Sequence, residues 1–268
     1  MAKKGEVLDG RYEILALVGK GDFSQTWLAL DKRLNKPWAI KEFEKRVSDS
    51  VLAECDLMNM LNHSGIPHIV DKLERENSIY IVMDYIEGDV LANLLKSGPQ
   101  PEESVVEWAK QLCDILAYLH RQTPPIIYRD MKPANIMLTP EGEIKLIDFG
   151  IVRQYKEGKL ADTMVLGTPG YASPEHMGSR QTDARSDIFT LGMTMHHLIT
   201  GVDPRPADYR YAPIRQWNSK LSKSMEAIID KCTAVRPEDR YQNCKELRYD
   251  LEQEIVKRKK GKKVSFFR

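Results

Sequence analysis

The spacing of apolar residues divides the chain into a first part rich in predicted strands and a second part rich in predicted helices. In the first part, short runs of β-branched and aromatic residues predict strands at residues 12–18, 26–30, 38–42 and 79–85. Residues 48–62 interrupt these strands, because the segment opens with polar capping candidates and then carries apolar residues at helical spacing. The pattern therefore predicts a β-rich lobe with a single amphipathic helix.

Helical periodicity dominates the rest of the chain. Pro101 and the two acidic residues after it are a helix start signal, and apolar residues then recur every three or four positions. Residues 136–138 and 144–147 predict two short strands joined as a hairpin, and the helical pattern returns from about residue 187 to 256. We therefore predict an α+β architecture in which a small β-rich lobe precedes a larger, mainly helical lobe.

Composition and charge exclude several classes of protein. The chain has 40 basic and 39 acidic residues, a formal net charge of +1, which argues against nucleic-acid binding over the whole surface. Apolar residues make up 42% of the sequence and can fill an ordinary core, which excludes the collagen-like and disordered classes.

The four cysteines form no CxxC pair, so we interpret them as reduced core thiols of a cytosolic protein. The first residues lack the apolar region of a secretory signal, and the longest mainly apolar stretch, 188–202, is shorter than the roughly 18 residues that indicate a membrane span.

A glycine-containing turn lies between the first two predicted strands. Residues 19–24 read Gly-Lys-Gly-Asp-Phe-Ser, and glycines allow a backbone to approach a phosphate closely. Taken alone, the pattern is better explained by a hairpin turn that needs glycine conformations. It becomes informative only together with other motifs.

Lys41 ends a predicted strand, and Glu54 lies thirteen residues later inside the apolar stripe of the predicted helix. An unpaired carboxylate buried there would cost several kcal/mol, so Lys41 is a sensible counter-ion whose ammonium group can also reach phosphate oxygens. The alternative is a purely structural ion pair beside an exposed strand lysine.

The predicted hairpin at 136–147 is flanked by polar residues suited to phosphate chemistry. Its antiparallel strands return the chain, so Asn135 before the first strand and Asp148 after the second are expected at the same end, where two hard oxygen donors suit Mg²⁺. Asp130 can then face a nucleophile as a proton acceptor, with Lys132 close enough to offset developing phosphoryl charge. The alternative is a set of unrelated loop residues.

Together these segments resemble the eukaryotic-type (Hanks-type) protein kinase domain over about residues 9–255. The motifs of that family are matched in order by residues 19–24, 38–41, Glu54, 129–135, 148–150 and 173–175. Lys132, together with Gly-Thr-Pro-Gly-Tyr at 167–171, resembles the serine/threonine branch rather than the tyrosine branch. The sequence of residues 125–133 and the compact length of the domain are similar to those of bacterial members.

The resemblance implies a bilobal kinase fold. Residues 1–86 would form the ATP-binding N-lobe and hinge, residues 87–256 the C-lobe with catalytic loop, activation segment and substrate-binding elements, and residues 257–268 a basic tail. The implied activity is transfer of the γ-phosphoryl group of ATP to serine and threonine hydroxyls of proteins in signal transduction, with autophosphorylation in the activation loop. The implied cofactors are ATP and Mg²⁺, with Mn²⁺ as a possible substitute.

Two rival functions remain open at this point. A nucleotide-binding pseudokinase or signalling scaffold would share the fold, but Lys41, Asp130, Asn135 and Asp148 are all intact. A small-molecule kinase of related fold would not be expected to carry the elements at 167–175. The sequence therefore favours a protein substrate.

The resemblance also implies a role for each matched residue. The catalytic residues would be Asp130, Lys132, Lys41 and Thr168, and the metal ligands would be Asn135 and Asp148. Val18 and Ala39 would lie above the adenine and Met137 below it, with Met83 as gatekeeper. The full set of implied ATP-binding residues is Val18, Gly19, Lys20, Gly21, Asp22, Phe23, Ser24, Thr26, Ala39, Lys41, Glu54, Met83, Asp84, Ile86 and Met137.

Some residues depart from the commonest family pattern. Ser24 replaces the third glycine of the loop, Thr26 replaces a valine, Tyr128 replaces the histidine before Arg-Asp, and Ser173 replaces an alanine. None of these changes removes a phosphate, metal or proton-transfer group, so we expect them to leave the activity in place.

Regulation is implied by Arg129, the position at which related kinases clamp a phosphorylated activation loop. Thr163, five residues before Thr168, is the first phosphosite hypothesis. The alternative is that Thr163 is a loop hydroxyl and that Arg129 binds local carbonyls.

Three further residues are implied to be structural. Asp187 would N-cap the apolar run that follows it and fix the backbone of the catalytic loop. Arg240 would pair with Glu175 in the helical lobe.

The last twelve residues, 257–268, hold seven basic residues and no acid, so residues 1–256 carry a formal charge of 1 − 7 = −6. One interpretation is a solvated tail. The other is a juxtamembrane polybasic segment, with a membrane span beyond residue 268, that would tether a cytoplasmic kinase domain in a longer chain. Specific nucleic-acid binding by the tail has less support, and the sequence predicts no oligomeric state.

Overall fold

The computed structural model describes residues 2–21, 24–44, 55–149, 153–154, 167–177, 181–206 and 211–265, with the side chains of 153–154 and 256–265 left aside. It contains two compact units, one made of Met1–Gly88 with Lys145–Gly150 and one made of Asp89–Ile144 with Ile151–Arg268.

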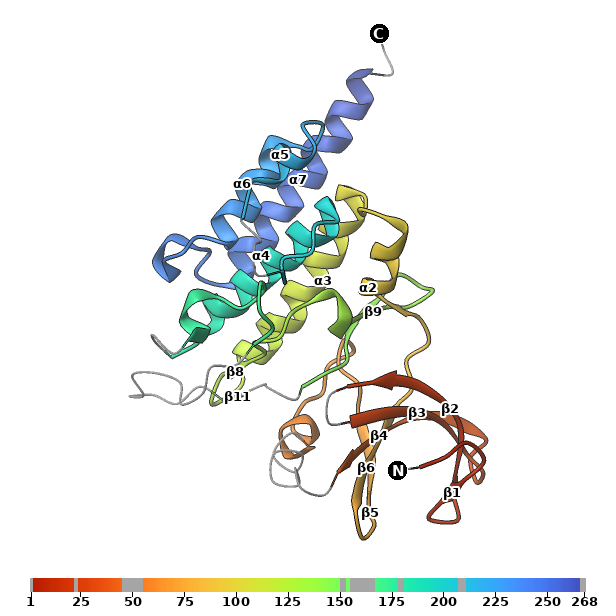
Figure 1. Ribbon diagram of the computed structural model, residues 1–268. Coiled ribbons are helices and arrows are strands. Elements are labelled where there is room, and N and C mark those ends of the chain that lie inside the picture. Colours follow the sequence, from red (N-terminus) through yellow and green to blue (C-terminus); the bar gives the residue numbers. More distant parts are fainter. Residues whose placement is uncertain are drawn as a thin grey trace. The chain divides into compact units, whose positions relative to one another are not determined.

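The first unit is built on a six-stranded antiparallel sheet of order β1-β2-β3-β4-β6-β5 (Figure 1). Its strands are β1 (Val7–Leu8), β2 (Tyr12–Lys20), β3 (Ser24–Asp31), β4 (Lys36–Glu44), β5 (Ile69–Glu74) and β6 (Ser78–Asp84). The strands predicted at 12–18, 26–30, 38–42 and 79–85 correspond to β2, β3, β4 and β6. The structure adds the short edge strand β1 and the strand β5.

The sheet is buried on both faces because side chains alternate along each strand. Ile40 and Val82 belong to one apolar cluster, whereas their neighbours Ala39 and Met83 belong to a second cluster with Ile81. In the register of β4 and β6, Ala39 lies opposite Met83 and Lys41 opposite Ile81. The sheet therefore fixes the positions of Ala39, Lys41 and Met83 relative to one another. Of the helix predicted at 48–62, residues 55–62 are described, and the helix runs over 55–59 and ends there.

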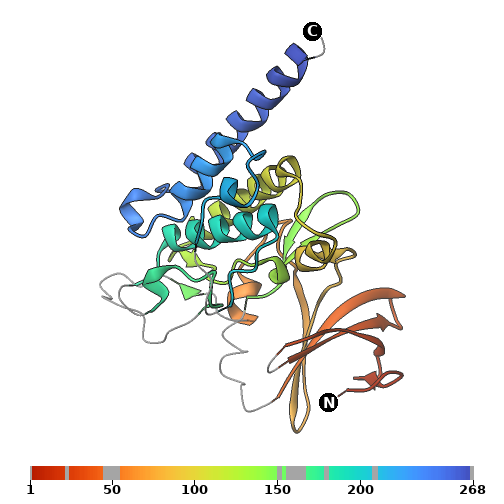
Figure 2. The same cartoon turned by 45° about the horizontal axis from the view of Figure 1, so that its top comes forward.

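The second unit is mainly helical. Its helices are α2 (Leu91–Leu94), α3 (Glu102–His120), α4 (Ala184–Thr200), α5 (Ile214–Trp217), α6 (Lys223–Cys232) and α7 (Cys244–Ser265), with short 3₁₀ turns η2 (Leu95–Ser97), η3 (Pro133–Asn135), η4 (Pro174–Met177) and η5 (Pro237–Asp239). Figures 1 and 2 show α3 and α4 packed together and α7 running along α3, with the last turns of α7 extending past the other helices of the unit.

Short strands form two smaller sheets. The strands β7 (Asp89–Val90), β9 (Ile136–Leu138) and β10 (Ile144–Leu146) form one small sheet, and β8 (Ile126–Ile127) pairs with β11 (Arg153–Gln154). The strands predicted at 136–138 and 144–147 correspond to β9 and β10.

Helix α4 is buried nearly all round, and its first turn differs from the sequence prediction. The N-cap is Asp183, whose side chain accepts the backbone N–H of Arg185 and forms a capping box with Ser186. Asp187 was predicted to be the N-cap, which is wrong: it lies inside the first turn of α4, fully buried. The helix begins one turn earlier because Asp183 takes the capping role, which leaves the carboxylate of Asp187 for another partner.

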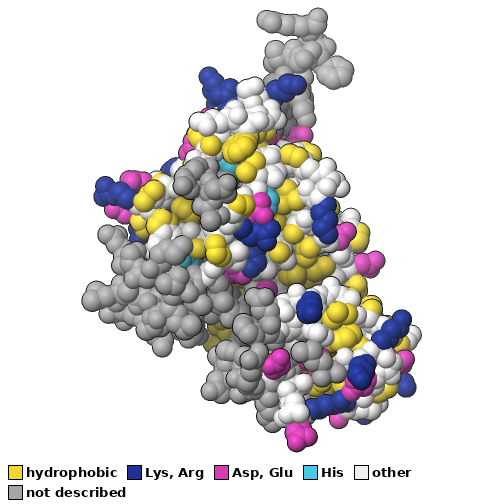
Figure 3. All heavy atoms as spheres, in the orientation of Figure 1, with side chains coloured by type: hydrophobic (Ala, Val, Ile, Leu, Met, Phe, Trp, Pro, Cys, Tyr) yellow, Lys and Arg dark blue, Asp and Glu magenta, His cyan; other side chains and the backbone are white. Residues whose placement is uncertain are grey.

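The cysteines and the surface agree with the interpretation of composition. All four cysteines are buried, and none of them forms a disulfide. On the face shown in Figure 3, basic and acidic side chains are interspersed with apolar ones. Within the described residues, no helix is both long and apolar enough to cross a membrane.

Candidate active site

Three polar side chains of the second unit converge on Asp130, in the loop between β8 and β9. The Lys132 ammonium donates to Asp130 Oδ2 at 2.7 Å, and the Thr168 hydroxyl donates to Asp130 Oδ1 at 2.6 Å. Lys132 also donates to Thr168 Oγ1 at 2.7 Å, and the amide of Asn135 donates to Asp130 Oδ2 at 2.8 Å. Both carboxylate oxygens are therefore held in place by a closed ring of hydrogen bonds.

Sequence local to this loop explains how the ring forms. Pro133 starts the 3₁₀ turn η3, which carries Asn135 back over the loop so that its Nδ2 also donates to the Asp130 carbonyl at 3.0 Å. Because Nδ2 is engaged with Asp130, the opposite atom of the amide, Oδ1, is the one left for a cation. The Asp130 side chain is only 14% exposed, so its charge interacts with these partners in a poorly screened setting.

The loop is fastened to helix α4 by three hydrogen bonds. Asp187 accepts the backbone N–H of Tyr128 at 2.9 Å and that of Arg129 at 2.7 Å, and the Thr194 hydroxyl donates to the Met131 carbonyl at 2.9 Å. Thr194 was missed in the sequence analysis. It lies seven residues after Asp187, two helical turns along the same face, and that spacing is the signal that could have identified it.

The segment after Thr168 is fixed in the same unit. Tyr171 donates its hydroxyl to Nδ1 of His197 at 2.5 Å, and burial lowers the pKa of His197 to about 4, which keeps the imidazole neutral and able to accept at pH 7. Gly170 has φ +82°, and a Cβ there would lie 2.0 Å from the Pro204 carbonyl oxygen, so only glycine fits. The 167–171 segment thus has one defined conformation beside Asp130.

Glu175 and Arg240 form a buried ion pair. Arg240 donates to Glu175 Oε1 at 2.6 Å and to Oε2 at 3.0 Å, and Ser186 donates to Oε1 at 2.7 Å. Burial by itself would raise the pKa of Glu175, but the hydrogen bonds from Arg240 and Ser186 outweigh it and lower the pKa to about 2. The carboxylate is therefore ionised at every physiological pH and connects η4 to the start of α4.

In the first unit, Lys41 projects from β4 toward Asp148. The Lys41 ammonium lies 3.0 Å from Asp148 Oδ1, and the two side chains are 13% and 43% exposed. Lys41 is flanked in the sheet by Thr26 of β3 and Ile81 of β6. The structure therefore brings together a lysine and a carboxylate that the sequence assigned to phosphate and metal binding.

Other predicted nucleotide-binding residues are placed on the same sheet. Val18 is half exposed on β2, whereas Ala39 and Met83 are buried to 9% and 8% exposure on β4 and β6. Behind them is a small cavity of about 10 Å³ lined by Lys41, Met83 and Cys55 among others. Cys55 was not singled out by the sequence analysis.

The remaining predicted residues fall into two groups. Gly19 and Lys20 end β2, Gly21 follows them, and Ser24 begins β3. Asp84 ends β6, Ile86 follows it, and Met137 lies on β9 of the second unit. Asp22, Phe23, Glu54, Gly150 and Thr163 lie outside the described residues. Asn135 and Asp148 belong to different units, so the shared metal site stays a prediction, as does the regulatory pairing of Arg129 with Thr163.

Carboxylate and amide oxygens are the donors that Mg²⁺ prefers, so Asp148 and Oδ1 of Asn135 fit the ion chemically. Within the described part of the chain, no cluster of three or more His, Cys, Asp or Glu could hold a metal on its own.

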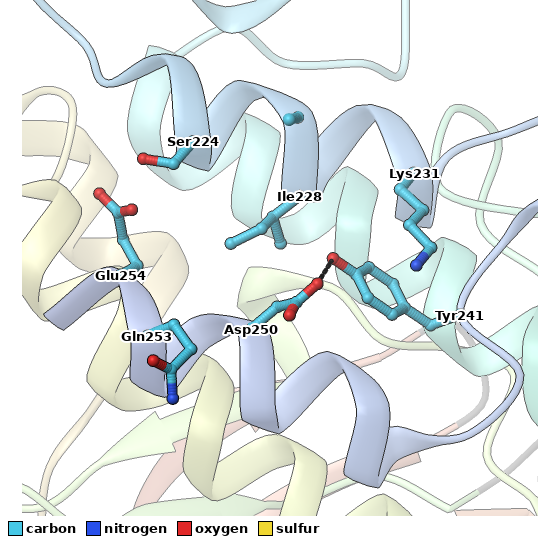
Figure 4. Close-up of a pocket in the computed structure, with 8 residues that line it drawn as sticks. Ser224, Ile228, Lys231, Tyr241, Asp250, Gln253 and Glu254 are labelled. Carbon is cyan, nitrogen blue, oxygen red and sulfur yellow. Dashed lines mark hydrogen bonds between the residues drawn. The ribbon is translucent and has the colours of Figure 1, made fainter. Parts of the chain in front are cut away.

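A larger cavity, of about 460 Å³, opens between α6 and α7 (Figure 4). The Tyr241 hydroxyl donates to Asp250 Oδ2 at 2.8 Å within it, and the Lys231 ammonium lies 4.0 Å from the centre of the Tyr241 ring. Ser224, Gln253 and Glu254 line the other end. None of the residues around Asp130 lines this cavity, so it takes no part in the chemistry described above.

Comparison with known proteins identifies the family. The protein kinase domain model matches residues 12–250. Serine/threonine-protein kinase PknB of Mycobacterium leprae is 32% identical over 91% of this chain and 43% of its own length, and PknB of Mycobacterium tuberculosis gives the same values. A probable serine/threonine-protein kinase of Streptomyces coelicolor is 32% identical over 91% of this chain and 40% of its own length. The chain thus spans less than half the length of these relatives, and it belongs to the protein kinase domain family, among the Hanks-type serine/threonine kinases of bacteria.

Proposed function

We propose that this chain transfers the γ-phosphoryl group of ATP to serine and threonine hydroxyls of protein substrates, with Mg²⁺, and that it phosphorylates itself in the activation loop. The observation that carries the proposal is the ring of hydrogen bonds that orients both oxygens of Asp130. A carboxylate held in this way is suited to accept the proton of a substrate hydroxyl. The family relationship supports the same reaction.

Each residue of the ring has a task in this reaction. Asp130 aligns the substrate hydroxyl and takes its proton. The Lys132 ammonium, 2.7 Å from both Asp130 and Thr168, offsets negative charge that develops on the transferred group. Bound ATP with Mg²⁺ supplies the activated phosphoryl group. In this proposal Asn135 and Asp148 would hold the ion, and Lys41 would hold phosphate oxygens.

The segment that follows Thr168 favours a protein as the phosphoryl acceptor. Gly170 packs against the backbone at Pro204, and Tyr171 is fixed on His197, so a rigid stretch of chain borders Asp130. A rigid segment of this kind can position an extended peptide so that its hydroxyl lies at the Asp130 carboxylate. Such positioning is a main source of rate acceleration in phosphoryl transfer.

The test compares the parent with Asp130→Asn after incubation with γ-labelled ATP, Mg²⁺ and a generic protein substrate. The parent is expected to label serine or threonine, and Asp130→Asn is expected to bind ATP but transfer at least about a hundredfold more slowly, since general base catalysis contributes about 10² or more. Asp239→Asn is a matched control, because Asp239 is an exposed carboxylate in η5 of the same unit. If the parent and Asp130→Asn bind ATP equally and the parent transfers no phosphate, the result would support the pseudokinase alternative instead.

We propose in addition that residues 257–268 bring the domain close to an anionic membrane. Helix α7 continues through residue 265, so most of the basic segment is helical and extends past the other helices of its unit. Each basic residue near anionic lipid contributes about 1 kcal/mol. Sedimentation with phosphatidylserine vesicles, with and without residues 257–268, tests this, and equal binding by the two forms would refute it.

A further inference from the structure

The ends of three helices meet behind the loop that carries Asp130. Helix α3 ends at His120, α4 contributes Asp187 from its first turn, and α7 begins at Cys244. His120 Nε2 lies 2.7 Å from Asp187 Oδ2, and the Cys244 sulfur lies 3.7 Å from His120 Nδ1, within hydrogen-bond reach of a thiol. The three side chains therefore form a continuous polar chain that runs from α7 to α4.

Asp187 holds the catalytic loop in a conformation that the loop would not adopt alone. Arg129 has φ +74°, in the left-handed region that is disfavoured for a residue with a Cβ. The two oxygens of Asp187 accept the backbone N–H groups of Tyr128 and Arg129, the two N–H groups that lead into this strained residue. Asp130 follows directly, so any shift of the Asp187 carboxylate is transmitted to Asp130.

His120 acts on Asp187 through a defined ring nitrogen. The Asp187 carboxylate has no proton to donate, so it accepts the hydrogen bond from the imidazole as it accepts those from the two backbone N–H groups. The proton must therefore be on Nε2 of His120. In the neutral ring Nδ1 is then an acceptor. Cys244 is 2% exposed, and burial raises the pKa of its thiol well above the ordinary value, so it stays protonated and can donate S–H to Nδ1.

We propose that Cys244 and His120 are positioning residues of the phosphoryl transfer: the Cys244 thiol fixes the tautomer of His120, and His120 holds the Asp187 carboxylate on the backbone of the loop that carries Asp130. The kinetic part rests on the proposed kinase function, and the tautomer does not. Neither residue touches substrate or nucleotide in this role. Their effect reaches the reaction through Asp187 alone.

The surroundings of His120 determine how its protonation acts. Asp187 of α4 and Cys244 of α7 face the ring directly, and α3 adds Cys113 and Asp114 near the thiol. Asp114 is paired with Arg248 of α7 at 2.8 Å. Asp187 is therefore the unbalanced charge in contact with the ring. An imidazolium would bind it more strongly and compete with the N–H groups of the loop for its oxygens.

The tautomer can be measured directly in the unmodified chain. Long-range ¹⁵N–¹H correlation spectra of the histidine rings, with His120 assigned by its loss in His120→Gln, should show a protonated Nε2 and an unprotonated Nδ1 at pH 7. In Cys244→Ala the donor to Nδ1 is lost, so the share of His120 rings with the proton on Nδ1 should increase in these spectra, and Cys244→Ser should restore the parent pattern. A proton on Nδ1 instead of Nε2 in the parent, or identical ring spectra in all three proteins, would overturn the proposal.

Kinetics then separate positioning from mere stability. Cys244→Ala should lower kcat several-fold with the KM values for ATP and peptide unchanged, and Cys244→Ser should restore the parent kcat. Cys232→Ala is the matched control, because Cys232 is an equally buried thiol that lies on another helix, α6. Equal kcat values for Cys244→Ala and Cys232→Ala would refute the positioning role. An inactive parent would refute the proposed function and leave the NMR test of the tautomer in force.

Discussion

Replacing Glu175 by Gln is expected to lower the free energy of unfolding by about 3 kcal/mol. Each tenfold change in acid dissociation is worth about 1.4 kcal/mol, and the pKa of Glu175 is about 2 in the folded protein against an ordinary value of about 4.3. That difference corresponds to about 3 kcal/mol of preference for the ionised form. A second, independent estimate agrees: removal of one partner from a buried ion pair lowers the free energy of unfolding by about 3 to 5 kcal/mol, because the other charge is left unpaired. The Glu175 and Arg240 side chains are 5% and 0% exposed, so water does not replace the missing partner.

Urea unfolding followed by circular dichroism measures this loss. The contribution of the Glu175 carboxylate is fully present above about pH 4.3 and is lost as the pH falls toward 2, because its pKa is lowered on folding. The parent should therefore lose stability over that interval more steeply than Glu175→Gln. The double variant Glu175→Gln, Arg240→Met should recover part of the loss, since the unpaired charge is removed. A loss below about 0.5 kcal/mol in Glu175→Gln, typical of a surface substitution, would refute the reasoning.

Three further predictions concern the chemistry and the substrate segment. Thr168→Val removes one hydroxyl donor from Asp130 and should lower kcat about tenfold with little change in the KM for ATP, as steady-state assays would show; a change confined to KM would contradict the assigned role. Gly170→Ala places a Cβ 2.0 Å from the Pro204 carbonyl oxygen at φ +82°, so the 167–171 segment must shift, and peptide phosphorylation should fall while ATP affinity measured by calorimetry is kept. Lys41→Met should weaken ATP binding at least tenfold with an unchanged circular dichroism spectrum, and unaltered ATP affinity would remove Lys41 from the phosphate site.

The sequence predicted the strands that border the nucleotide site because their signal is local. Runs of β-branched and aromatic residues between turns located β2, β3, β4 and β6. It missed β5 (Ile69–Glu74), in which only alternate residues face inward and the sequence reads as mixed polar and apolar. It also misplaced the start of α4, because Asp183 and Asp187 are both plausible caps and the apolar run begins after the second.

The candidate site was predictable as a set of residues but not as a set of contacts. The motif order identified Asp130, Lys132, Asn135 and Thr168, and the structure brings these four together in one unit. The left-handed conformation of Arg129 and the packing of three helix ends behind the loop depend on tertiary contacts between segments far apart in the sequence. No local pattern encodes such contacts.

The most direct test of the central claim is mass-spectrometric identification of the acceptor atom after reaction with ATP and Mg²⁺. The account predicts phosphate on serine or threonine hydroxyls of a protein substrate and of the chain itself in the parent, and at least about a hundredfold less in Asp130→Asn at equal ATP occupancy. Equal phosphorylation by the parent and Asp130→Asn, or ATP binding without any phosphorylated protein in the parent, would contradict it.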